Sequence, residues 1–367
     1  MSTNKKTLIF TGGHHSSSLP VALNLKNRGW NIIWIGHRYS MQGDASDSVE
    51  YREVTASGIT FYELKAGKFF GGLSGRKIFQ IPFGFVNAMK ILMKIFNTRG
   101  IRVSGIVSFG GYLALPVIIC GWLLGIPGIT HEQTTVSGLA NRVISVFVKK
   151  IALTWPQSSD NFPNNKTTVV GLPVRPEITG ITRKPVTDGL PVIYFTGGKQ
   201  GSHLLNSMVF QTLDKLLTGY EIVHQTGGNT VHRDYENALR IKKDLSPEHS
   251  RSYRPEKYLS SEEVAQVLTK ASVVVGRAGA HTIYELAFLG IPSVLVPISW
   301  SSRNEQNSNA DFLVNNNLAV KLSEKELSPD SLLDAISKAV LLPPHPLSVP
   351  ADALEKMTGL IEDTFKK

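Results

Sequence analysis

The chain has 367 residues, of which 42% are hydrophobic, and it carries a formal net charge of +10. This length predicts about two domains, and the composition is typical of globular rather than disordered proteins. The positive charge favours an anionic partner: nucleic acid, an anionic lipid surface or a phosphorylated substrate. Because Cys120 is the single cysteine, an intrachain disulfide and a cysteine-cluster metal site are excluded, and we expect a reducing, cytosolic setting.

Neither a targeting segment nor a membrane-spanning helix is expected. The first residues run into a strand without a signal-peptide pattern. Residues 103–129 come closest to an apolar span, but glycines and prolines divide them into separate elements.

The chain begins with a strand, a glycine-rich turn and a helix. Residues 7–10 predict a buried strand, and residues 11–18 form a loop of glycines and hydroxyl side chains. A helix is expected over residues 19–29, with its proline in the first turn and a serine as N-cap, and a second strand over residues 30–36. This βαβ unit is typical of nucleotide-binding α/β folds, although G-x-G-x-x-G spacing is absent. His14 in the loop is either a catalytic residue or a merely structural or exposed histidine.

Residues 63–96 mix basic and bulky apolar side chains. Residues 68–85 fit a surface that rests on an anionic bilayer, whereas residues 86–96 resemble an ordinary amphipathic helix with solvated lysines. The candidate membrane-contacting residues are Lys68, Phe69, Phe70, Arg76, Lys77, Phe79 and Phe83. Nucleic acid is the weaker alternative, because no RNA-binding motif accompanies these phenylalanines.

In the remainder of the first half, polar or glycine-rich segments follow the apolar strands. Residues 106–112 predict a strand and a glycine-rich turn. His131–Gln133 follow another strand at its carboxyl end, where open α/β sheets place their ligands. A helix is expected over residues 141–150, and residues 169–177 form a last strand with an exit turn.

A second half repeats this layout after a polar linker. A strand over residues 191–196 leads into a second glycine-rich turn, residues 197–202, and a helix over residues 204–217. Free N–H groups at such a helix start can hold phosphate oxygens. The turn lacks the spacing and the terminal Lys-Ser/Thr of a P-loop, so ATP hydrolysis is not indicated.

A third strand–turn–helix unit begins at residues 273–275. We expect Thr282 and Glu285 to form a capping box at the start of its helix and Gly290 to end it. Glu285 is then either a capping partner only or a carboxylate that holds a ribose diol. Strands and helices continue to residue 340.

The sequence therefore predicts an α/β protein with two Rossmann-like domains facing across a cleft, the GT-B arrangement of nucleotide-sugar glycosyltransferases. The first domain is expected over residues 1–177, a linker over 178–190 and the second domain over 191–350. A terminal helix, residues 351–367, is expected to pack back on the first domain.

The order and spacing of six motifs, over about residues 7–340, resemble the MurG family. The motifs are Phe109–Tyr112, His131–Gln133 with Gly138–Asn141, Gly171–Arg175, Gly197–Gly201 with Asn206, Arg277–Glu285, and Gln306 with Asn309–Ala310. Members of that family are bacterial hexosyltransferases that transfer N-acetylglucosamine (GlcNAc) from UDP-GlcNAc to lipid I, forming lipid II for peptidoglycan synthesis.

The resemblance implies two groups of site residues. The donor group is Arg175, Gly198, Lys199, Gly201, Ser202, Asn206, Leu259, Arg277, Gly279, Ala280, Glu285, Gln306 and Asn309. The acceptor group is Thr11, Gly12, Gly13, Tyr112, His131 and Asn141. Within them, Glu285 is expected on the ribose hydroxyls and the backbone around Leu259 at the uracil.

The implied reaction is inverting displacement at the anomeric carbon by the C4 hydroxyl of N-acetylmuramic acid (MurNAc). His14 is the first candidate for the general base, since an imidazole suits proton transfer near neutral pH. Glu132 is the second candidate, and its alternative role is to orient His131 or the acceptor. Helix N-termini and arginines are expected to stabilise the leaving UDP without metal or cofactor, because no D-x-D or His/Cys cluster appears.

The implied partners are UDP-GlcNAc, undecaprenyl-linked lipid I, an anionic membrane surface and other cell-wall synthesis proteins, without nucleic acid. The expected location is the cytoplasmic face of the plasma membrane, as a peripheral protein.

Thr134, Lys199 and His281 depart from the family pattern, which leaves the identities of the donor sugar and the acceptor open. One alternative is another inverting UDP-sugar transferase with a lipid acceptor such as diacylglycerol; a second is a non-catalytic nucleotide-sugar-binding subunit.

Overall fold

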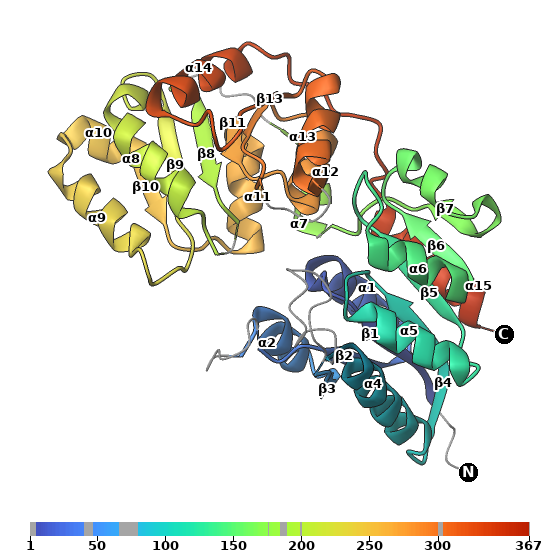
Figure 1. The fold of residues 1–367 in the computed structure, drawn as a ribbon. Helices are drawn as coiled ribbons and strands as arrows, with labels where there is room; N and C mark the ends of the chain where they lie inside the picture. The colour runs from blue at the N-terminus through green and yellow to red at the C-terminus, as the bar shows by residue number, and fades with distance from the viewer. Residues whose placement is uncertain are drawn as a thin grey trace. The chain divides into compact units, whose positions relative to one another are not determined.

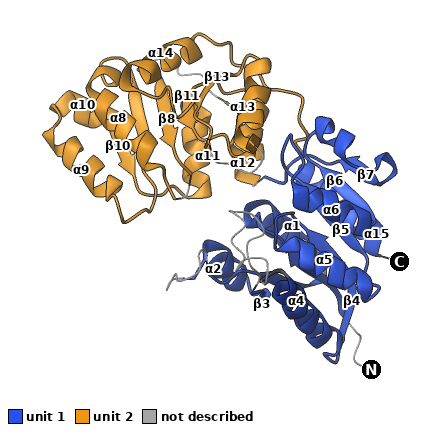
Figure 2. Cartoon of the chain, viewed as in Figure 1, with its two compact units in different colours: residues 1–174, 352–367 blue, residues 175–351 orange. Residues whose placement is uncertain are grey.

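The computed structural model describes residues 5–39, 47–65, 80–174, 176–183, 189–198, 200–299 and 304–366. The chain divides into two compact units, residues 1–174 with 352–367 and residues 175–351, coloured separately in Figure 2. The membrane-contact candidates before residue 80, together with Arg175 and Lys199, lie outside the described residues.

In the described part of the first unit, seven parallel strands form one sheet in the order β3-β2-β1-β4-β5-β6-β7 (Figure 1). The strands are β1 Lys5–Thr11, β2 Asn31–Gly36, β3 Thr60–Glu63, β4 Ile101–Ser108, β5 Gly128–Glu132, β6 Lys150–Leu153 and β7 Thr167–Val169. The central strands are short apolar runs, because helices cover both faces of a parallel sheet and bury alternate side chains on either side.

The helices of the first unit are α1 His15–Asn27, α2 Val49–Ala56, α4 Gln80–Phe96, α5 Ala114–Leu123, α6 Leu139–Phe147 and α15 Ala353–Phe365. Ile9 and Ile106 of the sheet share one core with α4, α5 and α6. Phe10 and Trp34 share the opposite core with α1 and α15. The terminal helix therefore belongs to the first unit, where Glu362 accepts hydrogen bonds from Arg28 at 3.1 Å and from the Trp30 indole at 3.2 Å.

Three sequence predictions about the first unit are wrong in their boundaries. Helix α1 begins at His15, so its proline lies inside the helix and no serine caps it. The Ser18 hydroxyl instead donates to the His14 carbonyl at 3.0 Å and supports the first turn. The helix expected over residues 141–150 ends at Phe147 and is followed by β6, and the last strand ends at Val169. Strands of three or four residues are too short to show a period in the sequence.

In the described part of the second unit, six parallel strands form a sheet in the order β10-β9-β8-β11-β12-β13. The strands are β8 Val192–Thr196, β9 Glu221–Gln225, β10 Tyr253–Glu256, β11 Ala271–Gly276, β12 Ser293–Leu295 and β13 Ala319–Lys321. The helices are α7 Pro176–Thr179, α8 His203–Leu216, α9 Asp234–Asp244, α10 Pro247–Ser252, α11 Ser261–Lys270, α12 Ala280–Leu289, α13 Glu305–Asn315 and α14 Pro329–Val340. Strand β10 was not predicted; it tolerates Pro255 because it is an edge strand.

The start of α12 differs from its prediction. Gly279 is the N-cap and the helix begins at Ala280, without a side-chain cap. Thr282 and Glu285 therefore lie inside the helix, and the predicted capping box is wrong. The extended backbone of Gly279 brings the chain into the helix three residues earlier than the capping pattern suggested. Gly290, with φ 63°, ends the helix as predicted.

Candidate functional site

The acceptor-side candidates lie at the carboxyl ends of β1, β4 and β5. Strand β1 pairs with β2 on one side and β4 on the other, so the chain order reverses there, and α/β sheets bind ligands at such a point. The loops that follow β1 and β4 touch: Gly13 N–H donates to Gly110 O at 3.2 Å, and Phe109 N–H donates to Thr11 O at 2.9 Å. The sheet thereby brings Thr11, Gly12 and Gly13 beside the 109–112 turn.

Glu132 is a buried carboxylate that accepts four hydrogen bonds. Its Oε1 receives the backbone N–H of Thr134 at 3.1 Å and the Thr134 hydroxyl at 2.8 Å. Its Oε2 receives Gly138 N–H and Asn141 Nδ2, both at 3.0 Å. With its lone pairs filled by its own loop, Glu132 organises residues 134–138 rather than presenting a free base. Thr134, a departure from the family pattern, supplies two of these donors.

Asn141 connects this loop to the strand ends. Its Nδ2 also donates to His131 O at 3.2 Å, and its Oδ1 accepts from the Thr130 hydroxyl at 2.9 Å. The same amide packs on Gly110, where a Cβ would lie 2.8 Å from Nδ2 and where φ is +72°. Only glycine suits both the backbone angle and this contact. Asn141 therefore holds the loops after β4 and β5 in one arrangement.

His131 and Gln133 each have one buried acceptor atom that accepts no hydrogen bond within the described part of the chain. His131 Nε2 donates to Gly171 O at 3.0 Å, so its Nδ1 carries a lone pair. Within the described part of the chain, neither this Nδ1 nor Gln133 Oε1 has a hydrogen-bond partner, although Gln133 Nε2 donates to Ser17 Oγ at 2.7 Å. Burial lowers the pKa of His131 to about 4, despite the bond to Gly171. His131 is therefore neutral at physiological pH.

His14 is the N-cap residue of α1 and its side chain is exposed. Desolvation by the surrounding protein lowers the pKa of His14, against the opposing charge of Glu132, and His15 lowers it further. Because the side chain reaches solvent, water limits this shift. A neutral, accessible imidazole at the switch point of the sheet is able to accept a proton.

Tyr112 lies beside a group of titratable side chains at the end of β2. Its ring is 5.6 Å from the His37 ring. Glu50 accepts a 2.7 Å hydrogen bond from the Trp34 indole, and burial raises the pKa of Glu50 to about 7. Desolvation, together with the charge of Glu50, raises the pKa of Tyr112 to about 12. No local pattern in the sequence marks Glu50 as a functional candidate, because its partners are remote along the chain.

The donor-side candidates lie at the ends of β8 and β11, where the strand order of the second sheet also reverses. Arg277 joins the turns after these two strands. It donates to Ser202 Oγ at 2.9 Å and to Val296 O at 3.0 Å, and it pairs with Glu324 at 2.8 Å. Desolvation of the Glu324 carboxylate raises its pKa, but hydrogen bonds from Ser299 and Arg277 outweigh this effect and hold the pKa of Glu324 below its usual value.

Several predicted donor ligands act within the unit; Asn206 and Asn309 are buried and Gln306 is half-buried. Asn206 donates to Thr226 O at 2.9 Å, and Asn309 donates to Ala278 O at 3.1 Å. Gln306 Oε1 accepts from Ile298 N–H at 3.1 Å. These amides shape the turns around the candidate site, and Leu259 is likewise buried in the second unit.

Glu285 lies one helical turn beyond the start of α12 and is half-buried. Burial raises the pKa of Tyr194 on β8, and the negative charge of Glu285 adds to this shift. Gly198, Gly201, Gly279 and Ala280 occupy the two turns at the ends of β8 and β11. This placement keeps Glu285 a candidate ribose ligand.

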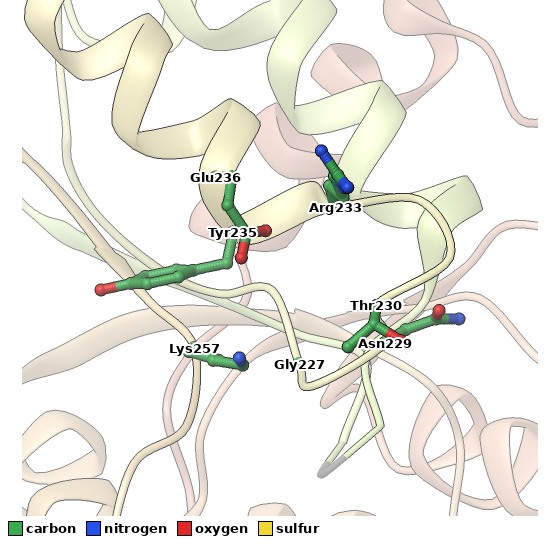
Figure 3. Close-up of a pocket in the computed structure, with 7 residues that line it drawn as sticks. All are labelled: Gly227, Asn229, Thr230, Arg233, Tyr235, Glu236 and Lys257. Atoms are coloured by element: carbon green, nitrogen blue, oxygen red, sulfur yellow. The ribbon is translucent and has the colours of Figure 1, made fainter.

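An open cavity of about 470 Å³ lies elsewhere in the second unit, and sequence reasoning missed it. It is lined by Gly227, Asn229, Thr230, Arg233, Tyr235, Glu236 and Lys257 (Figure 3). The predicted donor residues that the structure describes are not among its lining residues. It lies at the ends of β9 and β10, away from the reversal point.

Helices α4, α5 and α6 pack against one another in sequence (Figure 1). Each carries exposed apolar side chains, which we treat together as one face. We call it the α4–α6 face; its residues are Phe83, Val86, Met93, Phe96, Trp122, Leu123, Leu139, Val143 and Val146. Exposed Lys90, Lys94 and Lys149 lie on the same helices or directly after them. Phe83 was predicted from sequence, whereas the α5 and α6 members were not. In the described residues, no helix has both the length and the apolar character needed to cross a membrane.

Two domain patterns of one glycosyltransferase family match the chain. The glycosyltransferase family 28 N-terminal domain matches residues 9–153, and the family 28 C-terminal domain matches residues 192–363. Two similar proteins are named UDP-N-acetylglucosamine--N-acetylmuramyl-(pentapeptide) pyrophosphoryl-undecaprenol N-acetylglucosamine transferase. The one from Treponema denticola is 31% identical, covering 87% of this chain and 83% of the relative. The one from Psychromonas ingrahamii is 30% identical, covering 90% and 88%.

The chain belongs to this family of N-acetylglucosamine transferases. The crystal structure of Acinetobacter baumannii MurG has the same fold, with a TM-score of 0.72 over 98% of this chain and 99% of that one, at 23% identity. The predicted GT-B class, with two Rossmann-like α/β domains, is confirmed. The expectation of a hexosyltransferase of the MurG family is confirmed as well.

Proposed function

We propose that this family 28 enzyme transfers GlcNAc from UDP-GlcNAc to the MurNAc C4 hydroxyl of undecaprenyl-linked lipid I, producing lipid II. The observation that carries the proposal is the near full-length similarity to transferases with that named reaction. The polar strand ends of both units, in the positions that the resemblance assigns to acceptor and donor, support it.

On the acceptor side, the proposed base is His14. It is exposed at the first turn of α1, and its lowered pKa favours the neutral form that accepts a proton. Glu132 is assigned a positioning role, because its four hydrogen bonds are all made to the loop that follows it and to the start of α6. As His14 takes the hydroxyl proton, the new C–O bond forms and the bond from the anomeric carbon to the UDP oxygen breaks, inverting that carbon.

On the donor side, the leaving diphosphate gains negative charge as the bond breaks. Backbone N–H groups at the starts of α8 and α12 are aligned dipoles that favour an anion without reorganising. Arg277 fixes the α8 turn through Ser202. We propose that this electrostatic stabilisation operates without a metal ion or cofactor.

The α4–α6 face supplies a means of reaching a lipid-linked acceptor. Trp122 is 52% exposed and Val146 is 69% exposed, and such side chains on adjacent helices beside lysines suit the headgroup region of an anionic bilayer. We propose peripheral association with the cytoplasmic surface of the plasma membrane through this face.

Product analysis tests the function directly. Purified protein is incubated with UDP-GlcNAc and a lipid I analogue, and the expected product carries one added GlcNAc with inverted anomeric configuration. Reactions with UDP-glucose and diacylglycerol run in parallel. Turnover of that second pair, with none of the first, would replace the proposed acceptor and donor by those of a glycolipid synthase.

A further inference from the structure

A buried hydrogen-bond network lies behind the α8 turn, and Asp234 is at its centre. Asp234 is the first residue of α9 and its side chain is 5% exposed. Its Oδ1 accepts from His203 Nδ1 at 2.8 Å, and its Oδ2 accepts from Asn206 Nδ2 at 2.7 Å. His203 is the first residue of α8, directly after Ser202. The carboxylate of one residue, at the start of α9, therefore accepts two hydrogen bonds from the first turn of α8.

The network continues into the core of the unit and fixes the orientation of Asn206. Asn206 uses its second N–H on Thr226 O at 2.9 Å, so its Oδ1 accepts from His224 Nε2 at 3.0 Å. His224 Nδ1 then accepts from the Tyr253 hydroxyl at 3.0 Å. Burial lowers the pKa of His224 to about 3, so the ring stays neutral and this donor pattern persists. The Asn206 amide that donates to Asp234 therefore cannot rotate without breaking its two other hydrogen bonds.

The turn before α8 also contacts the loop that follows β9 through backbone atoms. A Cβ at Gly201 would lie 1.9 Å from Thr226 O, and a Cβ at Gly227 would lie 2.2 Å from Gly201 N. Both glycines also have positive φ angles, +78° and +87°. The turn 198–202 and the loop 226–227 thus meet without side chains between them. The segment that connects β9 to Asp234 therefore lies directly against the turn before α8.

We propose that Asp234 is a positioning residue for the donor diphosphate, acting through Asn206 and His203 on the α8 turn. Asp234 does not touch the donor in this arrangement. It sets the direction of the N–H groups at the start of α8, on which binding of the diphosphate depends. The inference rests on the proposed function, because it takes UDP-GlcNAc as the ligand of that turn.

The test uses Asp234→Ala in the full-length protein. This change leaves one N–H of buried Asn206 without its acceptor and releases His203. We expect the Kd for UDP, measured by titration calorimetry, and the KM for UDP-GlcNAc to rise at least about tenfold. The KM for the lipid I analogue should stay unchanged, because the network lies within the donor unit. A general loss of folding would not separate the two substrates in this way.

A conservative variant and a matched control sharpen the result. Asp234→Asn keeps an acceptor oxygen for Asn206, so we expect UDP affinity within about threefold of the wild type. Glu236→Ala removes the other acid of the first turn of α9, which is exposed, and should leave UDP affinity unchanged. If Asp234→Ala does not fold, His203→Ala replaces it; this side chain is 47% exposed, and we expect a rise of about threefold or more.

Each remaining outcome identifies what has failed. Unchanged UDP affinity in folded Asp234→Ala, or in His203→Ala where that variant replaces it, would overturn the inference. An Asp234→Asn variant as weak as Asp234→Ala would also overturn it, since the acceptor oxygen would then be irrelevant. Wild-type protein that does not bind UDP would contradict the proposed function itself.

Discussion

Asn141 Nδ2 lies 3.0 Å from Glu132 Oε2, and this hydrogen bond joins the start of α6 to the end of β5. With this bond and three others, the Glu132 carboxylate is engaged in holding the structure together and is not free to accept a proton from a substrate. The two candidates for the general base therefore occupy different environments, with His14 exposed and Glu132 buried and fully hydrogen-bonded.

Glu132→Gln is expected to lower the free energy of unfolding by about 1–3 kcal/mol, because its new NH₂ group faces N–H donors that the carboxylate had accepted. Chemical denaturation measures this change. Turnover should also fall, while the pH profile of kcat/KM keeps the acid limb of the wild type. Loss of that limb with unchanged stability would instead identify Glu132 as the base.

His14→Ala is expected to lower kcat by about 10²–10⁴, the usual contribution of a general base. A base must be neutral to accept a proton, so wild-type activity should fall as the pH drops through the pKa of His14. Because the protein lowers this pKa from 6.5, the limb should lie below pH 6.5. The variant should lack this limb when kcat/KM is measured across pH, with His15→Ala as the neighbouring control. Full activity in His14→Ala would remove the assignment.

Glu50→Gln is expected to flatten the pH dependence of stability. The pKa of Glu50 is raised from 4.5 to about 7 in the folded protein, so folding retains a proton that the unfolded chain releases above pH 4.5. Wild-type stability should therefore fall as the pH rises from about 4.5 to about 7, and then level off. Glutamine keeps the acceptor for Trp34 without ionising.

Thermal unfolding across this pH window measures the Glu50 effect. Glu236→Gln, at an exposed acid of α9, is the control and should keep the wild-type slope. A Glu50→Gln variant that keeps the wild-type slope would show that Glu50 does not hold its proton in the folded state.

Charge introduced on the α4–α6 face is expected to release the protein from membranes. Trp122→Glu with Val146→Glu should weaken binding to anionic vesicles by about tenfold or more, since each change removes apolar contact and adds repulsion. Flotation with vesicles of anionic phospholipid measures the bound fraction. Activity on a water-soluble lipid I analogue should persist, because neither side chain lies at the strand ends.

A matched pair on another surface controls for the added charge. Val231 and Leu341 are exposed apolar residues of the second unit, and their replacement by glutamate should leave flotation unchanged. Equal vesicle binding by wild type and the Trp122/Val146 variant would exclude this face as the membrane contact.

The sequence by itself determined the class of the protein and the places where its site would form. Apolar runs followed by glycine turns predicted the βαβ repetition in both halves, because strand burial and turn geometry leave local signatures. The order of short motifs identified the family. Short strands such as β6 and β10, and the start of α12 at Ala280, escaped this reasoning because too few residues carry their signal.

Tertiary structure alone decided what the polar residues do. Asn206 was predicted to bind the donor, yet its amide is buried among Thr226, His224 and Asp234. Likewise, Trp122 and Val146 became parts of one surface only when α5 and α6 packed side by side. Sequence periodicity reports whether a side chain is buried, whereas its partners come from segments far along the chain. Those partners determine whether a polar group contacts a substrate or instead positions a loop that contacts the substrate.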